Sequence, residues 1–214
     1  MIPFKNHISR QNGLTIIEAV IYTSLLFIII VSGYKYYQIA VCQYGVESNK
    51  AELFQDLRTA VSMIYNDISL CGCDPLNNGR VGFVNETDNN DRYDTDANSI
   101  HMTSDLEYPW DGKALEQYET IIYFLYPQEN GLFKLGRCTG NGRRPQPVAE
   151  NIVSLHFDYY DLSGNIMSDP PLPLSTIGSV EFSIAAESSN INPFTHKKER
   201  VTLKTRVWVR NNLF

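Results

Sequence analysis

An apolar run near the N-terminus constrains this chain more than any other feature of its sequence. The stretch GLTIIEAVIYTSLLFIIIVSGYKYY covers residues 13–37, and a single carboxylate, Glu18, stands in the otherwise uncharged part. A helix over residues 14–34 would rise about 31 Å, which matches the hydrocarbon thickness of a bilayer. The run therefore predicts a membrane-spanning helix. Because a carboxylate in lipid costs free energy, we expect Glu18 to have a partner.

The segment before this run is short, polar and basic. MIPFKNHISRQNG contains Lys5, His7 and Arg10, has no acid and ends in Gly13. Basic flanks of a membrane helix stay on the cytoplasmic side. A secretory signal peptide would place a small-residue cleavage site after its apolar stretch, and YKYYQIAVCQYG offers no good one. We therefore expect the apolar helix to be retained and the rest of the chain to be exported.

The junction of leader and helix resembles the type IV pilin and pseudopilin superfamily. The matching residues are Gly13, Leu14, Thr15, Ile16, Ile17 and Glu18. The resemblance implies that a prepilin peptidase removes residues 1–13 and N-methylates Leu14, where most members have phenylalanine. It further implies that Thr15 and Glu18 serve assembly, with Glu18 meeting the free amine of Leu14 on a neighbouring subunit so that two buried charges neutralise each other.

Length and charge limit the other functions. The chain has 214 residues and a net charge of −6, and loss of the basic leader makes it more acidic, which argues against generic nucleic-acid binding. The charge is uneven: residues 86–119 hold ten acids against two bases, and residues 197–214 hold six bases against one acid. We expect both segments to be solvated surface, with docking as the alternative.

Four cysteines occur in the chain, at positions 42, 71, 73 and 138. An exported domain permits disulfides. Cys71 and Cys73 are too close in sequence to pair comfortably, so we expect one of them to bond Cys138 and Cys42 to stay free. The CGC stretch and the scattered histidines lack the spacing of a zinc site, so no metal is expected there.

The rest of the sequence predicts one α+β head. No proline occurs between Pro3 and Pro75, so we expect the helix to continue to residue 70 with an apolar stripe against the head's sheet. That stripe consists of Leu53, Leu57, Ala60, Val61, Ile64 and Ile68, with Phe54 expected on the sheet side as well. Asn77–Ala114 is predicted as loop with a short strand at 99–102. Period-two alternation predicts strands at 118–126, 132–138, 152–161, 179–187 and 200–210.

The predicted organisation has four parts: a cytoplasmic leader at 1–13, the transmembrane half of the helix at 14–37, its periplasmic half at 38–70 and a globular head at 71–214. Within the superfamily, the head resembles PilW-type minor pilins. The residues that carry this second resemblance are Arg58, Gly72, Cys73, Tyr123, Leu125, Gly131, Leu132, Ile152, Leu155, Tyr159, Arg210 and Asn211. The J-type pseudopilin of type II secretion is the nearest alternative, with the same fold and mechanism.

Sites for catalysis or cofactors are not evident in the sequence. No nucleophile elbow, HExxH, Walker A or dinucleotide fingerprint occurs, so we expect neither enzymatic activity nor a cofactor. A weak calcium candidate is DTDANSIHMTSD, where Asp94, Asp96, Asn98 and Asp105 mimic the oxygen spacing of a calcium loop. Ser99 stands where the turn glycine belongs, so an acidic loop is the favoured interpretation.

The resemblance implies a minor pilin of a type IV pilus priming or tip complex. Its partners would be other minor and major pilins, the prepilin peptidase and the inner-membrane assembly platform. Its location would be the inner membrane, with a single span and a periplasmic head, and then the fibre. The alternatives are a J-like secretion pseudopilin and a tip-displayed binding module that uses Trp110, Tyr159, Tyr160 and the basic C-terminal segment.

Overall fold

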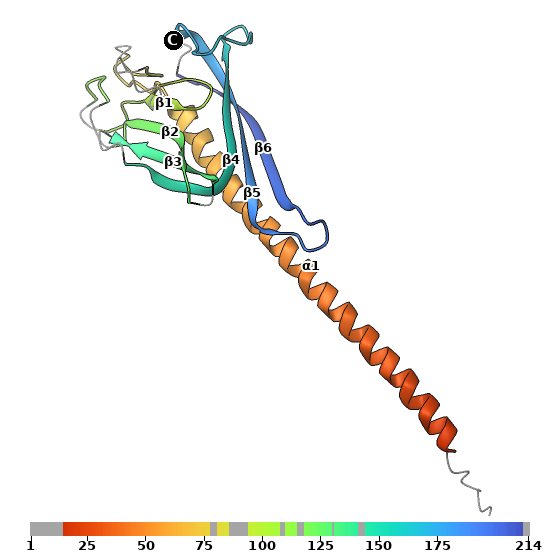
Figure 1. Ribbon diagram of the computed structural model, residues 1–214. Helices are drawn as coiled ribbons and strands as arrows, with labels where there is room; N and C mark the ends of the chain where they lie inside the picture. The colour runs from red at the N-terminus through yellow and green to blue at the C-terminus, as the bar shows by residue number, and fades with distance from the viewer. Residues whose placement is uncertain are drawn as a thin grey trace, which may run out of the picture. The chain divides into compact units, whose positions relative to one another are not determined.

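The computed structural model describes residues 15–77, 81–85, 94–107, 110–114, 118–129, 131–140 and 144–211. Within these ranges, one α-helix, α1 (Ile16–Leu70), is followed by six strands and a short 3-10 helix (Figure 1). The strands are β1 (Ile100–Thr103), β2 (Thr120–Pro127), β3 (Phe133–Thr139), β4 (Gln146–Asp161), β5 (Ile177–Ile191) and β6 (Lys198–Trp208), with η3 at Leu174–Thr176. The chain divides into two compact units, Met1–Glu47 and Ser48–Phe214, and the helix contributes to both.

Helix α1 runs for 55 residues without interruption. It contains no proline, and its two glycines, Gly33 and Gly45, stand in open space. The helix ends where Gly72 adopts a left-handed conformation with φ 73°, as glycine commonly does after the last helical turn. The Gly72 amide then donates to the Thr103 carbonyl at 3.0 Å, which fastens the end of the helix to β1.

One stripe of the second half of α1 forms the helical side of the core. The buried members are Leu53, Leu57, Ala60, Ile64 and Ile68, as the periodicity predicts. Val61 is half-buried at the margin of this core. The expectation for Phe54 is wrong: its side chain is 46% exposed, because the position falls beside the stripe that Leu53 and Leu57 define.

The strands form a single antiparallel sheet in the order β1-β2-β3-β4-β5-β6, so each strand pairs with its neighbour in sequence. The predicted α+β class, a long N-terminal helix with an antiparallel sheet, is confirmed. Strand β4 starts earlier than predicted. Its first part pairs with β3 and its second part with β5, and the register shifts near Asn151, whose φ is 57°. The bend at that residue lets one strand serve two neighbours.

The two faces of the sheet carry different hydrophobic clusters. The larger cluster includes the stripe of α1 together with Tyr123, Phe157 and Phe182, and the rings of Phe157 and Phe182 lie 6.0 Å apart. A small second cluster contains Ile122, Phe124 and Cys138. Alternation along β2 separates these sets, because consecutive side chains of a strand point to opposite faces.

Two buried carboxylates shape the loop between β1 and β2. Glu119 accepts hydrogen bonds from the amides of Leu106 and Glu107 at 3.1 and 3.0 Å, and Asp105 accepts one from Gly112 at 2.7 Å. Both acids are fully buried. The interpretation of this acidic region as solvated surface therefore fails for these two residues, because they satisfy the backbone of the loop.

Candidate functional site

The N-terminus of α1 is closed by a reciprocal cap between Thr15 and Glu18. The Glu18 carboxylate accepts hydrogen bonds from the Thr15 amide and the Thr15 hydroxyl, both at 2.9 Å, and the Glu18 amide donates to the Thr15 hydroxyl at 3.3 Å. This is a capping box, whose T-x-x-E signature can be read directly from TIIE. Gly13 and Leu14, the predicted cleavage and methylation positions, lie outside the described residues.

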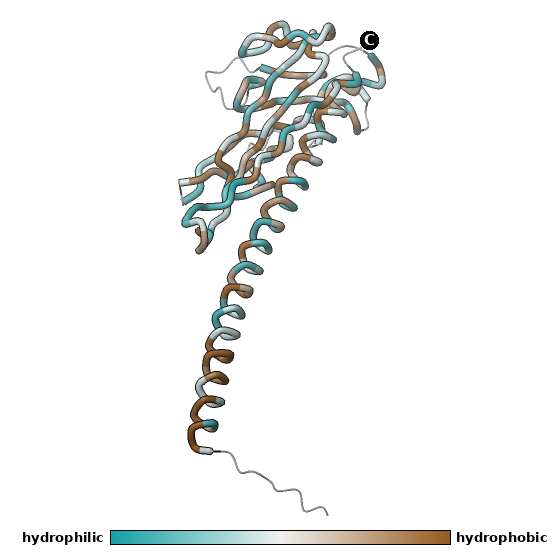
Figure 2. The backbone as a smooth tube through the Cα atoms, turned by 90° about the vertical axis from the view of Figure 1, so that its right-hand side faces the viewer, coloured by the Kyte–Doolittle hydropathy of each residue, from teal (hydrophilic) through white to brown (hydrophobic). Residues whose placement is uncertain are grey.

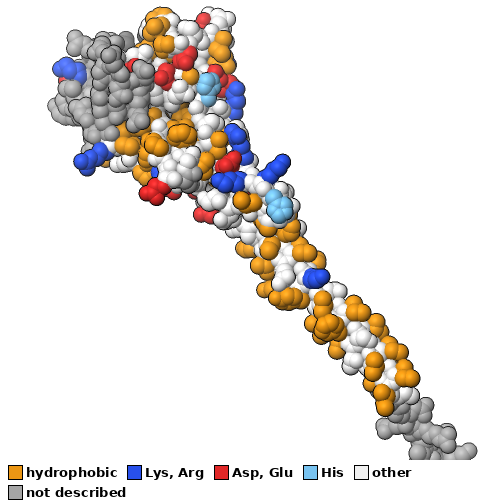
Figure 3. All heavy atoms as spheres, viewed as in Figure 1, with side chains coloured by type: hydrophobic (Ala, Val, Ile, Leu, Met, Phe, Trp, Pro, Cys, Tyr) orange, Lys and Arg blue, Asp and Glu red, His pale blue; other side chains and the backbone are white. Residues whose placement is uncertain are grey.

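The first half of α1 exposes apolar side chains on all sides. Figures 2 and 3 show hydrophobic residues along this half, and residues 16–45 are exposed throughout. Two hydroxyls within it are satisfied by the helix itself: Ser24 donates to the Val20 carbonyl at 2.7 Å and Thr23 to the same carbonyl at 3.0 Å. Within the described chain, α1 has the length and apolar composition that crossing a membrane requires.

The second half of α1 is tied to the sheet by a polar network at the margin of the apolar core. The Tyr123 hydroxyl donates to the Asp67 carboxylate at 2.6 Å, and Arg137 Nε lies 2.9 Å from the same oxygen and 3.1 Å from the Tyr123 hydroxyl. Burial, reinforced by the charge of Asp67, raises the pKa of Tyr123 well above its usual range. The network joins α1 to β2 and β3. In the sequence, the position of Asp67 within one helical turn of the apolar stripe indicates a polar contact at the core. The sequence does not identify its partners, because Tyr123 and Arg137 are far away along the chain.

The face of β4, β5 and β6 opposite the large core carries aromatic and charged side chains. The Arg206 guanidinium lies over the Tyr160 ring at 3.7 Å and near the Trp208 ring at 5.2 Å, and it donates to the Ser179 hydroxyl. Trp208 is 61% exposed. Such a stacked row of arginine and aromatic rings is suited to contact with another macromolecule.

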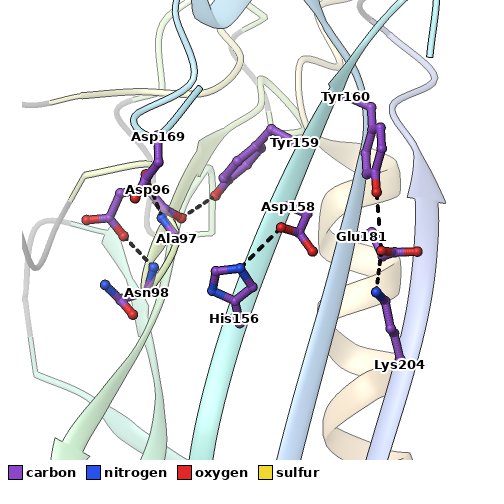
Figure 4. Close-up of polar contacts among 10 residues, drawn as sticks. All are labelled: Asp96, Ala97, Asn98, His156, Asp158, Tyr159, Tyr160, Asp169, Glu181 and Lys204. Carbon is purple, nitrogen blue, oxygen red and sulfur yellow. Dashed lines mark hydrogen bonds and ion pairs between the residues drawn. The ribbon is translucent and has the colours of Figure 1, made fainter. Parts of the chain in front are cut away.

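An ion pair continues the same face along the strands (Figure 4). Lys204 lies 2.6 Å from Glu181, which also accepts a hydrogen bond from the Tyr160 hydroxyl at 3.3 Å. The hydrogen bond with Lys204 lowers the pKa of Glu181 and raises that of Lys204. On β4, His156 Nε2 lies 3.1 Å from the Asp158 carboxylate. The Lys204–Glu181 and Tyr160–Glu181 contacts connect neighbouring strands, whereas the His156–Asp158 contact lies within β4. None of these contacts aligns a nucleophile with a base.

The aromatic contacts suggested for a binding module divide into two groups. Tyr160 lies on this outer face, and Trp110 is 51% exposed. Tyr159 is buried in the core, and its hydroxyl donates to the Asp96 carbonyl (Figure 4). The same hydroxyl also donates to the Ser99 carbonyl. The assignment of Tyr159 as a contact residue is therefore wrong. It was misplaced because consecutive tyrosines on a strand point to opposite faces.

All four cysteines are free in the structure. The expected disulfide to Cys138 is not formed. Cys71 belongs to the large core at the end of α1, whereas Cys138 belongs to the small cluster on the other face of the sheet. Cys73 is half-buried, and its carbonyl accepts the Asp105 amide. Burial raises the pKa of the Cys71 and Cys138 thiols, which makes both poor nucleophiles.

The calcium candidate does not form a site among the described residues. The Asp96 carboxylate accepts the amides of Asn98 and Ser99 in a local turn, and strand β1 separates this turn from Asp105. Asp105 binds the Gly112 amide instead. Across the ranges that the structure describes, no three histidine, cysteine, aspartate or glutamate side chains are arranged to hold a metal ion.

Residues near the C-terminus stabilise the end of the helix, which sequence reasoning did not anticipate. The Asn211 side chain donates to the Cys71 carbonyl at 3.3 Å. The resemblance singled out Asn211 without giving it a role. This bond joins positions 140 residues apart in sequence, so only the folded chain could reveal it.

Comparisons with known proteins give remote structural likeness and no match in sequence. No protein-family model matches the chain, and no curated protein matches it. Among solved structures, the chain is similar to the type IV-like pilin TTHA1219 from Thermus thermophilus, with 10% identity and a TM-score of 0.42. The match covers 74% of this chain and 97% of that protein. It is distant in both sequence and backbone, so the functional assignment depends on the residues of the chain itself.

Proposed function

We propose that this chain, whose long N-terminal helix and sheet head are type IV pilin-like, is a structural subunit of a type IV pilus or a related pseudopilus. The observation that carries the proposal is the division of one continuous helix. The first half of α1 is apolar and exposed, and the second half forms the core of the head. Lipid covers the first half before assembly, and the helices of neighbouring subunits cover it in the fibre.

The proposed processing follows from the residues at the leader junction. A prepilin peptidase of the inner membrane removes residues 1–13 and methylates the new amine of Leu14. Glu18 then meets the amine of a neighbouring subunit, which leaves no unpaired charge in the helix bundle. The protein has a structural role in this proposal, which is to join other pilins on the assembly platform.

Within this class we propose a minor pilin of a priming or tip complex. The short PilW-type elements along the head support this assignment, and the J-type pseudopilin remains the alternative. Deletion of the gene separates priming from display. Loss of all fibres indicates priming, whereas normal fibres that no longer adhere indicate a tip-displayed binding module.

The binding module is a second candidate because of one specific observation. Tyr160, Arg206 and Trp208 form an exposed stacked row on the outer face of the sheet. Replacement of Trp208 by alanine would then abolish adhesion while fibre number stays normal. A priming subunit would show the same fibre number and the same adhesion with that substitution.

The test of the leading proposal uses Glu18→Ala with Glu47→Ala as the matched control. Both glutamates are exposed on α1, and Glu18 is the one at the N-terminal cap. We expect Glu18→Ala to reach normal amounts in the membrane but to be absent from sheared fibres, and Glu47→Ala to be present in both. Equal incorporation of the two variants would overturn the role of Glu18 in assembly.

A further inference from the structure

The last strand leaves one edge of the sheet open. Strand β6 is the final member of the sheet order, and no described strand lies on its other side (Figure 1). Its pairs with β5 run without a register shift from Ser179–Trp208 to Glu187–Arg200, and β6 contains no proline. Natural edge strands are usually protected by bulges, prolines, short length or charged side chains, and β6 has only the last of these. This edge is long and regular.

The backbone groups on the open edge can be identified from one hydrogen bond. The Val209 amide donates to the Gly178 carbonyl at 3.0 Å, so Val209 faces β5. Because alternate residues of an antiparallel strand face alternate neighbours, odd-numbered residues of β6 also face β5. The residues that direct their amides and carbonyls to the open edge are Arg200, Thr202, Lys204, Arg206 and Trp208.

The side chains along this edge are mostly cationic. Arg200 and Arg210 are exposed, and neither is in an ion pair within the part of the chain that the structure describes. Lys204 and Arg206 stand between them, held by Glu181 and Ser179. Pairing of β6 with β6 of a second copy would bring these cations together, and like charges on facing strands are destabilising. The edge therefore disfavours β6 of a second copy and favours an acidic strand.

We propose that β6 accepts an extended acidic segment of a different filament subunit as a seventh strand of this sheet. Main-chain hydrogen bonds from the even-numbered residues would provide the affinity, and Arg200 and Arg210 would select acidic side chains. The exposed Trp208 ring offers an apolar contact at one end of the strand. This inference depends on the proposed function only for the source of the strand.

Hydrogen exchange on the full chain in detergent tests the edge itself. The probe is a nine-residue peptide that alternates glutamate with valine, and the control peptide alternates lysine with valine. We expect the glutamate peptide to slow exchange at the amides of 200, 202, 204 and 206, with little change at 201, 203 and 205. Unchanged exchange at the even positions, or equal slowing by the lysine peptide, would overturn the proposal.

Two substitutions at one position separate backbone pairing from side-chain contact. Thr202→Pro removes an outward amide that β5 does not use, and proline is tolerated at such edge positions. Thr202→Ala keeps the amide. We expect the proline variant to lose the peptide-dependent protection and the alanine variant to keep it. Arg200→Glu leaves the backbone intact and should weaken binding of the glutamate peptide, which keeps the test informative if the proline variant does not fold.

Cross-linking in cells identifies the source of the strand. A photoreactive residue placed at position 202 should cross-link to an acidic extended segment of another pilin-like subunit, as mapped by peptide sequencing. If the chain is present in sheared fibres but gives no such cross-link, the strand-addition proposal is wrong and the filament role stands. If the chain is absent from fibres while the peptide still protects β6, the filament role fails and another source must supply the strand.

Discussion

At the scale of single residues, Glu18 has a structural partner within its own chain. Its carboxylate caps the first turn of α1 by accepting hydrogen bonds from Thr15. This cap gives a local reason for a glutamate at the start of an apolar helix, without a neighbouring subunit. A capping box satisfies two amides that a helix start leaves unpaired. Capping by Glu18 can therefore be tested separately from its proposed pairing with a neighbour's amine.

Glu18→Gln separates these two functions. Glutamine can accept the same hydrogen bonds in a capping box but carries no charge. If assembly needs the charge, the glutamine variant should insert in the membrane and be missing from sheared fibres, like the alanine variant. Quantitative immunoblots of the membrane and sheared fractions measure this. Normal fibre incorporation of the glutamine variant would mean that the cap alone supports assembly.

The Asp67 network makes a prediction about stability. Arg137→Met removes the cation and leaves a mostly buried carboxylate with only the Tyr123 hydroxyl, which should cost about 2–4 kcal/mol of unfolding free energy. Denaturant unfolding of the full chain in detergent measures the loss. Lys134→Met is the control, because the Lys134–Glu150 pair is more exposed and its loss should matter less.

The double variant Asp67→Leu with Arg137→Met tests the physical reason. Removal of both charges leaves no unpaired carboxylate, so the double variant should be more stable than Arg137→Met alone. A double variant that loses as much stability as the two single changes added together would contradict this explanation and would mean that the pair itself is strongly stabilising.

Two buried tyrosines predict a loss of stability in alkali. Burial is the main cause that raises the pKa of Tyr123 and Tyr159 above the ordinary value of about 10. Above that pH the unfolded chain releases these protons first, so it binds fewer protons than the folded chain and stability falls with rising pH. Melting curves at increasing pH should show a shallower decline for Tyr123→Phe than for the unsubstituted chain. Parallel declines would contradict the prediction.

At the scale of elements, the two sides of α1 differ in what a truncation should do. Leu57 is 1% exposed and lies in the core, whereas Phe54, three residues earlier, lies outside it. We expect Leu57→Ala to cost about 2–5 kcal/mol of unfolding free energy and Phe54→Ala less than about 1 kcal/mol. Chemical denaturation of both variants in the same detergent provides the comparison. A larger loss for Phe54→Ala would mean that its side chain is covered by a partner surface.

The elements that sequence reasoning located best are those with strong periodicity. The stripe of α1 and the existence of all six strands could be predicted, because apolar spacing directly reports burial. The start of β4 could not, since it depends on the bend at Asn151 that lets the strand change partners. The alternation of side chains along β3 argues against the expected disulfide to Cys138. Leu135 faces α1, so Cys138, three residues later, faces the opposite side of the sheet.

At the scale of the whole molecule, sequence and structure support different parts of the function. The proposed leader, the proposed cleavage position and the resemblance to pilins come from the sequence because they are local patterns. The Asp67 network and the open edge of β6 could not, because they combine residues from distant segments. The fold therefore adds surfaces to the proposed function, and that function begins with one proposed processing step.

That step supplies the last prediction, since every later stage depends on it. Gly13 offers no side chain at the proposed scissile bond, so a bulky residue there should block the prepilin peptidase. Gly13→Phe should still insert, because the apolar run and the basic residues Lys5 and Arg10 are unchanged. We expect it to accumulate as a membrane-bound precursor that keeps residues 1–13 and to be absent from sheared fibres.

Mass spectrometry of the N-terminus measures this outcome against a matched control. Gly45→Ala changes a glycine of α1 that stands in open space, so it should be processed normally and begin with methylated Leu14. A mature chain that begins at Met1, or after residue 37, would refute the pilin assignment, because the helix that carries Glu18 would then lack the free amine or be lost altogether.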